Sequence, residues 1–371
     1  MDMETSRLLP VSVLTGFLGS GKTTVLNHLM QQPEMSRTLV VINEFGEIGI
    51  DHDLMVKSTD EVVVEMASGC LCCTIRGDLV KTLREAPGRF AREGKLWFDR
   101  VVIETTGLAD PTPILHTLMT DAHVARLYRL DGVITTVDAV NGHDTLDKQM
   151  ESVKQAAVAD RLLLTKTDLV EPAALDSLRA RLRTLNPAAP QVAAENGVVD
   201  PASLFNAGLY NPETKSLDVE RWLKAEAYSD PHDHHHHHHH HHHHDVNRHD
   251  ESIRAVCVTI DQPISAVALE AWLDVLMTFQ GSNLLRMKGV INVVEVEQPV
   301  VVHAVQHIFH PPITLDDWPT TDRRSRMVFI TRDIDEKVIR DTLNMFARDR
   351  KETANDVSET NKAQVHTAEA Q

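Results

Sequence analysis

Three of the chain's four cysteines fall within four consecutive positions, and this cluster is the first candidate for chemistry. They are Cys70, Cys72 and Cys73. Soft thiolate ligands select Zn²⁺, Cu(I) or comparable ions, and a tetrahedral site would take its fourth ligand from elsewhere in the chain. Two alternatives stay open, namely buried cysteines that act as small hydrophobic residues and redox chemistry, although the spacing is not C-x-x-C. We expect a soft-metal site here. By contrast, Cys257 lies in an apolar run and is expected to be inert.

An unbroken run of eleven histidines, from His234 to His244, is a second candidate for metal binding. Imidazole binds Zn²⁺, Co²⁺, Ni²⁺ and Cu²⁺, and a low-complexity tract offers many exchanging sets of ligands. The tract lies inside the chain between Asp233 and Asp245, which argues against an expression tag. We expect a store or antenna of low specificity near the thiolate site, with tolerated low complexity as the alternative.

A phosphate-binding pattern, G-x-x-x-x-G-K-[ST], lies near the N-terminus between a short apolar run and a segment with helical spacing. In this pattern the glycines let backbone N–H groups face the phosphates, the lysine places a charge at the β and γ phosphates, and the threonine hydroxyl binds Mg²⁺. The predicted nucleotide-binding residues are Gly16, Gly19, Ser20, Gly21, Lys22, Thr23 and Thr24. We also count Lys22 among the catalytic residues and Thr23 as a Mg²⁺ ligand.

A carboxylate and a glycine follow another apolar run, in the sequence Val101 to Gly107. Ligands of open α/β sheets collect at the carboxyl ends of the strands, where this run would deliver Glu104. Glu104 could hold Mg²⁺ through water or orient a nucleophilic water, and the Gly107 N–H could sense the γ-phosphate. A simple sheet-edge residue is the alternative for Glu104.

The sequence Thr165-Lys166-Thr167-Asp168 predicts the base that the nucleotide carries. An aspartate can accept hydrogen bonds from N1–H and the 2-amino group of guanine, whereas adenine offers neither donor and would leave the carboxylate unpaired. The Lys166 stem can lie over the base. Because this element follows a P-loop and a later apolar run, we predict GTP rather than ATP.

An acidic segment, Asn43 to Asp51, joins the phosphate-binding region to the cysteines. Its place after the second expected strand is where GTPases keep a mobile switch. Glu44 or Glu47 could therefore join Mg²⁺ or the thiolate-bound metal, with a solvated acidic loop as the alternative.

The elements that must position these residues follow from hydrophobic periodicity. Short apolar runs alternate with helical patterns, which predicts a parallel sheet covered by helices on both faces. The expected strands are Leu8 to Thr15, Thr38 to Asn43, Val62 to Glu65, Arg100 to Glu104, Gly132 to Asp138 and Arg161 to Thr165, with a helix from Pro172 to Leu185. The second half predicts strands at Ala255 to Ile260, Gly289 to Glu297, Val300 to Ile308 and Met327 to Arg332, and helices at Ser265 to Met277 and Glu336 to Arg348.

The predicted fold is therefore α/β, a P-loop parallel-sheet GTPase domain with a smaller α+β C-terminal domain. We expect the first domain to cover residues 1–210, a histidine-rich linker 211–251, the second domain 252–349 and a disordered tail 350–371. One more helix is expected at Val219 to Ala227.

Composition narrows the range of partners and compartments. With 37 Lys and Arg against 54 Asp and Glu, the net charge is −17, which would repel phosphate backbones and disfavours nucleic-acid binding. We find no stretch of eighteen apolar residues that would span a membrane and no secretory start. Four cysteines do not make a disulfide framework for 371 residues, so we expect the reducing cytosol.

Together these motifs resemble the CobW-type metal-chaperone GTPases, relatives of UreG and HypB among the P-loop GTPases. The motifs are GFLGSGKTT, NEFGEIGID, GCLCC, ETTG and TKTD, and the segment from Trp318 to Thr331 resembles the family's C-terminal domain. The resemblance implies zinc or cobalt on the C-x-C-C cysteines and GTP on Gly19 to Thr24, Lys166 and Asp168. Thr165 replaces the commoner Asn of the base motif, which could loosen nucleotide binding.

We therefore expect a GTP-hydrolysing metallochaperone that uses GTP, Mg²⁺ and Zn²⁺ or Co²⁺ and delivers its metal to a client metalloprotein. GTP and Mg²⁺ would order the acidic segment beside the thiolates, and hydrolysis would relax it and release the metal. A metal-storage or sensing protein with GTP as a structural ligand is the main alternative, and a small-molecule kinase explains neither the cysteines nor TKTD. The oligomeric state stays open, a homodimer included.

Overall fold

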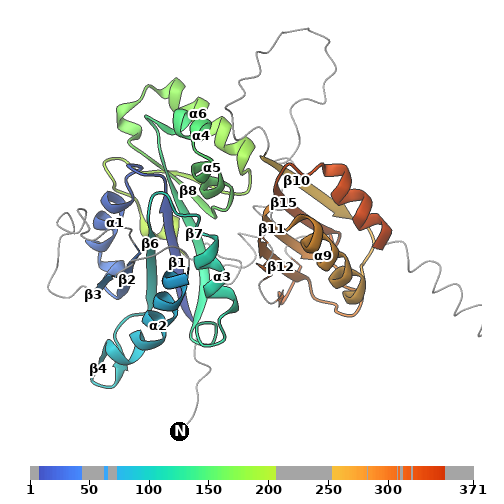
Figure 1. Ribbon diagram of the computed structural model, residues 1–371, viewed down its shortest axis with the longest axis horizontal. Coiled ribbons are helices and arrows are strands. Elements are labelled where there is room, and N and C mark those ends of the chain that lie inside the picture. Colours follow the sequence, from blue (N-terminus) through green and yellow to red (C-terminus); the bar gives the residue numbers. More distant parts are fainter. Residues whose placement is uncertain are drawn as a thin grey trace, which may run out of the picture.

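A computed structural model of the chain describes residues 8–43, 62–65, 73–205, 253–281, 283–306, 308–309, 312–318 and 321–346. Within these ranges the chain forms two layered units that lie side by side (Figure 1). The expected helix at Val219 to Ala227, the expected linker and the expected tail lie outside the described residues.

The N-terminal unit is built on a seven-stranded sheet whose strands pair in parallel, in the order β3-β2-β6-β1-β7-β8-β9. The strands are β1 Leu9–Gly16, β2 Thr38–Asn43, β3 Val62–Glu65, β6 Arg100–Thr105, β7 Tyr128–Asp138, β8 Arg161–Thr165 and β9 Gln191–Ala193. Continuous apolar runs form these strands because a parallel sheet is covered on both faces. The predicted parallel sheet is confirmed, and β9 is a strand that the prediction missed. A separate hairpin pairs β4 Ala91–Arg92 with β5 Lys95–Leu96.

Helices cover both faces of this sheet. They are α1 Lys22–Met30, α2 Cys73–Arg89, α3 Thr112–Thr120, α4 Gly142–Lys148, α5 Met150–Ala157, α6 Pro172–Leu185 and α7 Pro201–Leu204, with single 3₁₀ turns at Pro33–Met35 and Thr167–Leu169. On one face α1 packs against alternate strand residues such as Leu14 and Ile134. On the other face α2 and α3 pack against their neighbours Val13 and Val133, and α5 and α6 continue that layer. The predicted helix α6 is confirmed from its first residue to its last.

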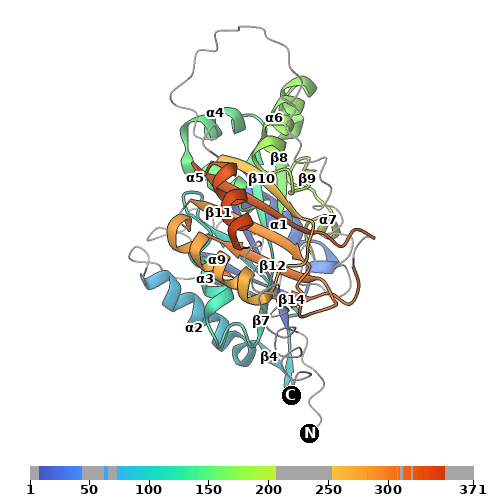
Figure 2. The ribbon, with the colours of Figure 1, turned by 90° about the vertical axis from the view of Figure 1, so that its right-hand side faces the viewer.

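The C-terminal unit is an antiparallel sheet with two helices on one face, which confirms the predicted α+β domain. Its elements are β10 Ile253–Ile260, α9 Ala266–Gln280, β11 Leu284–Ile291, β12 Val300–Val305, β13 Ile308–Phe309, β14 Ile313–Thr314, β15 Ser325–Arg332 and a last helix at 336–346. The two helices lie together over the sheet (Figure 2), where Trp272 of α9 donates a hydrogen bond to Thr342 at 3.1 Å. Ser265 caps α9 by accepting a hydrogen bond from the Ala268 N–H.

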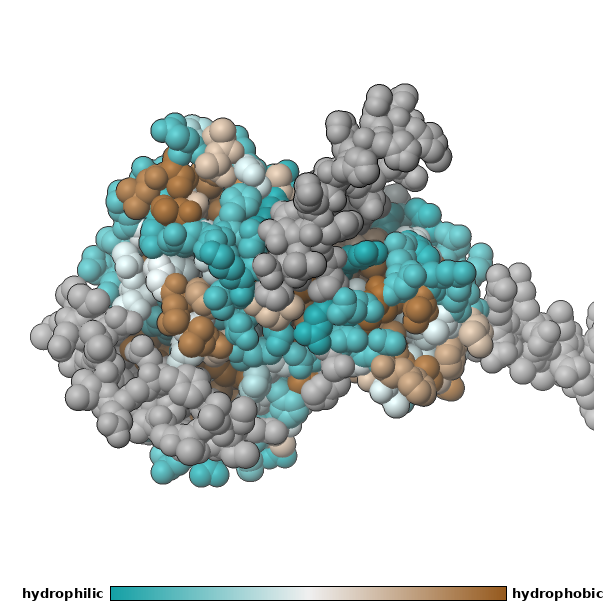
Figure 3. All heavy atoms as spheres, turned by 45° about the horizontal axis from the view of Figure 1, so that its top comes forward, coloured by the Kyte–Doolittle hydropathy of each residue, from teal (hydrophilic) through white to brown (hydrophobic). Residues whose placement is uncertain are grey.

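In the view of Figure 3 the described residues are mostly hydrophilic, and apolar ones gather in separate patches. None of the helices described here is long and apolar enough to cross a membrane.

Two strand predictions were wrong at the start of the strand, where charged residues occur. The expected strand Gly289 to Glu297 is instead β11, which begins at Leu284 and ends at Ile291, and β7 begins at Tyr128 rather than Gly132. Both segments contain charged residues, Arg286 among them, and hydrophobic periodicity predicts that such residues are exposed to solvent. In the fold Arg286 binds Asp160 on another element, while Asp131 accepts a hydrogen bond from Ser12 of β1 and pairs with Arg129 of its own strand. Arg286 and Asp131 are therefore buried rather than exposed.

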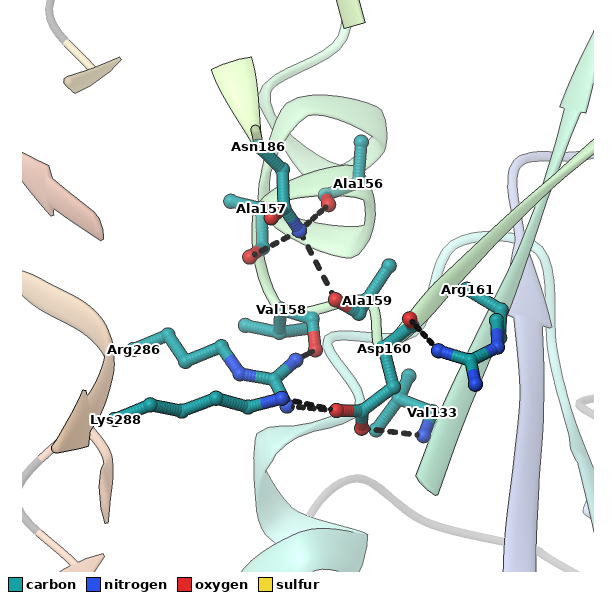
Figure 4. A network of polar contacts seen from close by, with 10 residues as sticks. All are labelled: Val133, Ala156, Ala157, Val158, Ala159, Asp160, Arg161, Asn186, Arg286 and Lys288. Carbon is teal, nitrogen blue, oxygen red and sulfur yellow. Dashed lines mark hydrogen bonds and ion pairs between the residues drawn. The ribbon is translucent and has the colours of Figure 1, made fainter. Parts of the chain in front are cut away.

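A buried carboxylate, Asp160, joins the two units (Figure 4). Its Oδ1 accepts hydrogen bonds from Arg286 and from the Lys288 ammonium, the latter at 2.7 Å, and its Oδ2 accepts one from the Val133 N–H at 2.9 Å. Burial alone would favour the neutral acid. The nearby Arg286 and Lys288 charges outweigh it and hold the pKa of Asp160 well below its usual range.

We expect Asp160→Asn to lower the free energy of unfolding by about 3–5 kcal/mol at pH 7, because it leaves two buried cations without their carboxylate. Urea unfolding measures this difference. The exposed Arg37–Asp99 pair gives the control, since Asp99→Asn should change stability little.

The same substitution predicts a pH dependence. The Asp160 pKa in the folded chain is lower than the value of about 3.9 expected on unfolding, so its stabilisation is fully present above about pH 4. It is lost as the pH falls below that value. The gap in unfolding free energy between wild type and variant should therefore shrink from pH 7 to pH 3, and a constant gap would contradict this assignment.

Candidate nucleotide site

The phosphate-binding loop connects the end of β1 to the start of α1. Gly21 has φ 89, a left-handed conformation that L side chains rarely adopt, and it is the N-cap residue directly before α1. A Cβ on Gly16 would lie 2.1 Å from Thr136 Oγ1, so only glycine lets the loop leave the sheet at this point. The backbone N–H groups at the first turn of α1 are free of intrahelical partners, which is the usual setting of a phosphate site.

Two side chains of the loop already have the geometry of a nucleotide site. The Lys22 ammonium donates to the carbonyls of Gly16 at 2.9 Å and Phe17 at 3.2 Å, so the lysine lies folded over the loop. The Thr23 hydroxyl donates to Glu104 Oε1 at 3.0 Å across 81 residues of sequence. Glu104 is only 6% exposed at the carboxyl end of β6. This pair of oxygens fits a hard divalent cation such as Mg²⁺.

The loop that follows β6 lies directly against the phosphate-binding loop. A Cβ on Gly107 would come within 2.6 Å of the Leu18 N atom and 2.7 Å of its Cα. The structure thus brings together Gly16, Lys22, Thr23, Glu104 and Gly107, which the sequence placed in one predicted site. A shift of either loop must move the other because their backbones are in contact.

The predicted base-binding motif ends β8 at the same edge. Thr165 donates its hydroxyl hydrogen to the Ser20 carbonyl at 2.7 Å, so the residue that departs from the commoner Asn ties this motif to the phosphate-binding loop. Lys166 has φ 55, and its ammonium donates to Asp138 Oδ2 at 2.7 Å. Asp168 lies exposed in the next turn.

Sequence reasoning missed Asp138, which holds the lysine of the base motif. Asp138 also accepts hydrogen bonds from the Val140 N–H at 2.8 Å and the Asn141 side chain at 2.9 Å. Burial opposes its charge, but the hydrogen bonds from Lys166 and Asn141 prevail and lower the pKa of Asp138. The signal was present, since an acidic residue at the carboxyl end of an apolar run lies at the ligand edge of a parallel sheet.

The loop after β9 is a second element that the prediction missed. A Cβ on Gly197, which has φ 82, would come within 2.6 Å of His28 on α1 and 2.9 Å of Thr24. The Asn196-Gly197 turn signal was readable, but β9 has three residues, too few to give a periodic pattern.

Most of the predicted transition-metal ligands lie outside the described residues, namely Glu44, Cys70, Cys72, His234 and His244. Cys73 is the first residue of α2. The described ranges contain no group of three His, Cys, Asp or Glu side chains that could hold a metal ion. Cys257 on β10 is half-buried, and burial raises the pKa of its thiol, which keeps it protonated and unreactive.

Comparison with known proteins identifies the family. A family model for the CobW/HypB/UreG nucleotide-binding domain matches residues 10–193, and a model for the CobW C-terminal domain matches residues 253–347. The chain is a member of the CobW/HypB/UreG family. Membership and the complete phosphate-binding loop together make it a P-loop GTPase.

Relatives of this CobW-family chain match along most of its length. The zinc chaperone YjiA of Escherichia coli is 30% identical over 90% of this chain and 96% of its own, and the zinc chaperone CobW of Pseudomonas aeruginosa is 30% identical over 92% of each. The crystal structure of the Zn(II)-bound YjiA GTPase from E. coli has a TM-score of 0.66 at 27% identity, covering 92% of this chain and 99% of that one.

We expect Gly107→Ala to slow GTP hydrolysis by about 100-fold, because the added methyl group displaces the loop from its contact with Leu18. Single-turnover hydrolysis measures the effect. Gly88→Ala on α2 is the matched control, since a Cβ there meets no atom within 4 Å. Equal rates for the two variants would show that this contact has no part in catalysis.

Proposed function

We propose that the chain is a GTP-driven metallochaperone that binds zinc at Cys70, Cys72 and Cys73 and delivers it to a client metalloprotein. The zinc chaperones at 30% identity support zinc as the metal, with cobalt as the alternative. Free thiolates at this site suit the reducing cytosol.

The observation that carries the proposal is the register of three neighbouring strands in the parallel sheet. Ile42 of β2 pairs with Glu65 of β3 on one side and with Glu104 of β6 on the other. Two strand spacings separate the backbone of Glu65 from that of Glu104, a distance of about 10 Å. Cys70 follows Glu65 by five residues, so the cysteine segment starts beside the carboxylate that faces the nucleotide.

This placement suggests how the nucleotide acts on the metal. β2 ends at Asn43, which pairs with Thr105 at the end of β6. The acidic segment that contains Glu44 therefore starts next to the loop that carries Gly107. A γ-phosphate contact at that loop would change the neighbouring segment, and with it the ligands around the thiolates.

The chain's own residues provide the hydrolytic site. Lys22 neutralises charge on the β and γ phosphates, and the Gly107 N–H binds the γ-phosphate oxygen. Thr23 and Glu104 would hold Mg²⁺, which when bound neutralises phosphate charge. Glu104 also orients the attacking water, and Asp168 selects guanine while Asp138 holds Lys166 over the base.

Coupling energy limits what hydrolysis can do to the metal. A coupling of about 1–3 kcal/mol changes affinity by about 5- to 150-fold. Release of zinc into free solution would therefore be incomplete, so transfer requires a docked client that supplies new ligands. A metal store would instead bind zinc equally in every nucleotide state, and the histidine tract is the feature that favours it.

We expect Zn²⁺ affinity to differ about 5- to 150-fold between Mg²⁺-GTP-analogue and GDP states. Chelator competition on a variant lacking residues 232–244 measures it, with Co²⁺ in parallel. Cys72→Ser in the same background should abolish tight binding and leave GTP affinity nearly unchanged. Tight binding that is the same in both nucleotide states would instead identify a metal store.

We expect Asp168→Asn to weaken GTP binding by about 10- to 100-fold, because it removes a charged acceptor from the guanine edge. The amide can donate to the 2-oxo group of xanthine, so preference should move to xanthosine triphosphate. Competition with a fluorescent GTP analogue measures both affinities, and an unchanged preference for GTP would place base recognition elsewhere.

A further inference from the structure

A buried amide on α5 contacts the loop that carries Gly107. Gln155 is 0% exposed, and its Nε2 donates to the carbonyls of Ala109 at 2.9 Å and Gly107 at 3.3 Å. The neighbouring Lys154 lies 3.6 Å from the Asp110 carboxylate. The last turn of α5 therefore holds the loop at two backbone carbonyls and one carboxylate.

Packing alone does not explain an amide at this position. The Oε1 atom of Gln155 is buried and has no hydrogen-bond partner among the described residues. A buried polar atom without a partner destabilises the fold, and an apolar side chain of the same shape would avoid that cost. The two donated hydrogen bonds to the loop are what an amide provides here and an apolar residue does not.

The C-terminal unit holds the same end of this short helix. α5 ends at Ala157, and the next carbonyl, that of Val158, accepts a hydrogen bond from Arg286 of β11. Arg286 and Lys288 also bind Asp160, as Figure 4 shows. Asn186 of α6 donates to three carbonyls at this end, those of Ala156, Ala157 and Ala159.

We propose that Gln155 is a positioning residue for GTP hydrolysis, and that α5 couples the loop at Gly107 to the C-terminal unit through Arg286. Gln155 acts on the backbone of the loop rather than on the nucleotide. A displacement of the loop when the γ-phosphate is lost moves the last turn of α5, and the carbonyl that follows this turn is bonded to Arg286 of β11. The proposal rests on the GTPase activity and is independent of where the metal binds.

Gln155→Met tests the first half, because methionine keeps the length of the side chain and removes both donors. We expect kcat to fall by about 10- to 100-fold while the affinity for GTP stays nearly unchanged, since the phosphate-binding loop and base motif are intact. Gln191→Met is the matched control, because Gln191 also donates its amide to a carbonyl, that of Arg179, at a distance from this loop.

Gln155→Glu gives a readout that a structural role would not produce. A carboxyl group donates to a carbonyl only when protonated, and burial raises its pKa above the ordinary value of about 4.3. Activity relative to wild type should therefore rise as the pH is lowered from 8 to 6. The Gln155→Met variant should show no such rise.

Hydrogen exchange tests the second half. The amides of β11 should exchange at different rates with GDP and with a non-hydrolysable GTP analogue in the full-length protein. Gln155→Met and Arg286→Met should each remove this difference, and Gln191→Met should keep it. A kcat within twofold of wild type in Gln155→Met overturns the positioning role, and a nucleotide-dependent β11 signal that persists in that variant overturns the coupling.

Discussion

Parallel pairing of seven strands is the constraint on which the rest of this structure depends. Because every strand of such a sheet points the same way, the loops that follow them emerge at a single edge. Residues as distant in sequence as Gly16, Glu104 and Thr165 are thus brought to one place. The register goes further, since it puts the backbone of Glu65 two strands from that of Glu104, so β3 ends at the same edge as the candidate nucleotide site.

Contacts at the carboxyl edge of the sheet join the loops to one another and hold them in place for a ligand. Thr23 bonds to Glu104, Thr165 bonds to the Ser20 carbonyl, and Gly107 leaves no room for a side chain beside Leu18. Two of these contacts link β6 and the loop after it to the phosphate-binding region, and the third links β8. Because interactions in a water-poor site are stronger than those in bulk solvent, we expect a site connected in this way to respond as a unit to the γ-phosphate.

The interface between the two units is built on charge rather than on apolar area alone. Asp160 is stabilised as an anion because Arg286 and Lys288 reach it from β11. Loss of the carboxylate, or of both cations, would leave a buried charge without a partner. Partial separation of this contact therefore costs more free energy than partial loss of apolar packing. Such a contact suits the proposed coupling between the Gly107 loop and the C-terminal unit, because it fixes one geometry and resists intermediate ones.

The sequence by itself determined the class of fold and the chemistry of its motifs. Strong local patterns can be read from the sequence because glycine conformations and burial on two faces restrict which residues can occur. Examples are the P-loop and the apolar runs at Thr38 to Asn43 and Arg161 to Thr165. The family resemblance, confirmed by the family models, rests on the same motifs.

Only the tertiary structure decided what the charged and amide residues do. Arg286, Asp160 and Gln155 have no local pattern that distinguishes a buried partner from a solvated side chain, because their partners lie far away in sequence. For that reason β11 was predicted to start five residues late, and the links from Asp138 to Lys166 and from Gln155 to Gly107 were not visible. Long-range pairing is fixed by the packing of whole elements, which a single run of residues does not encode.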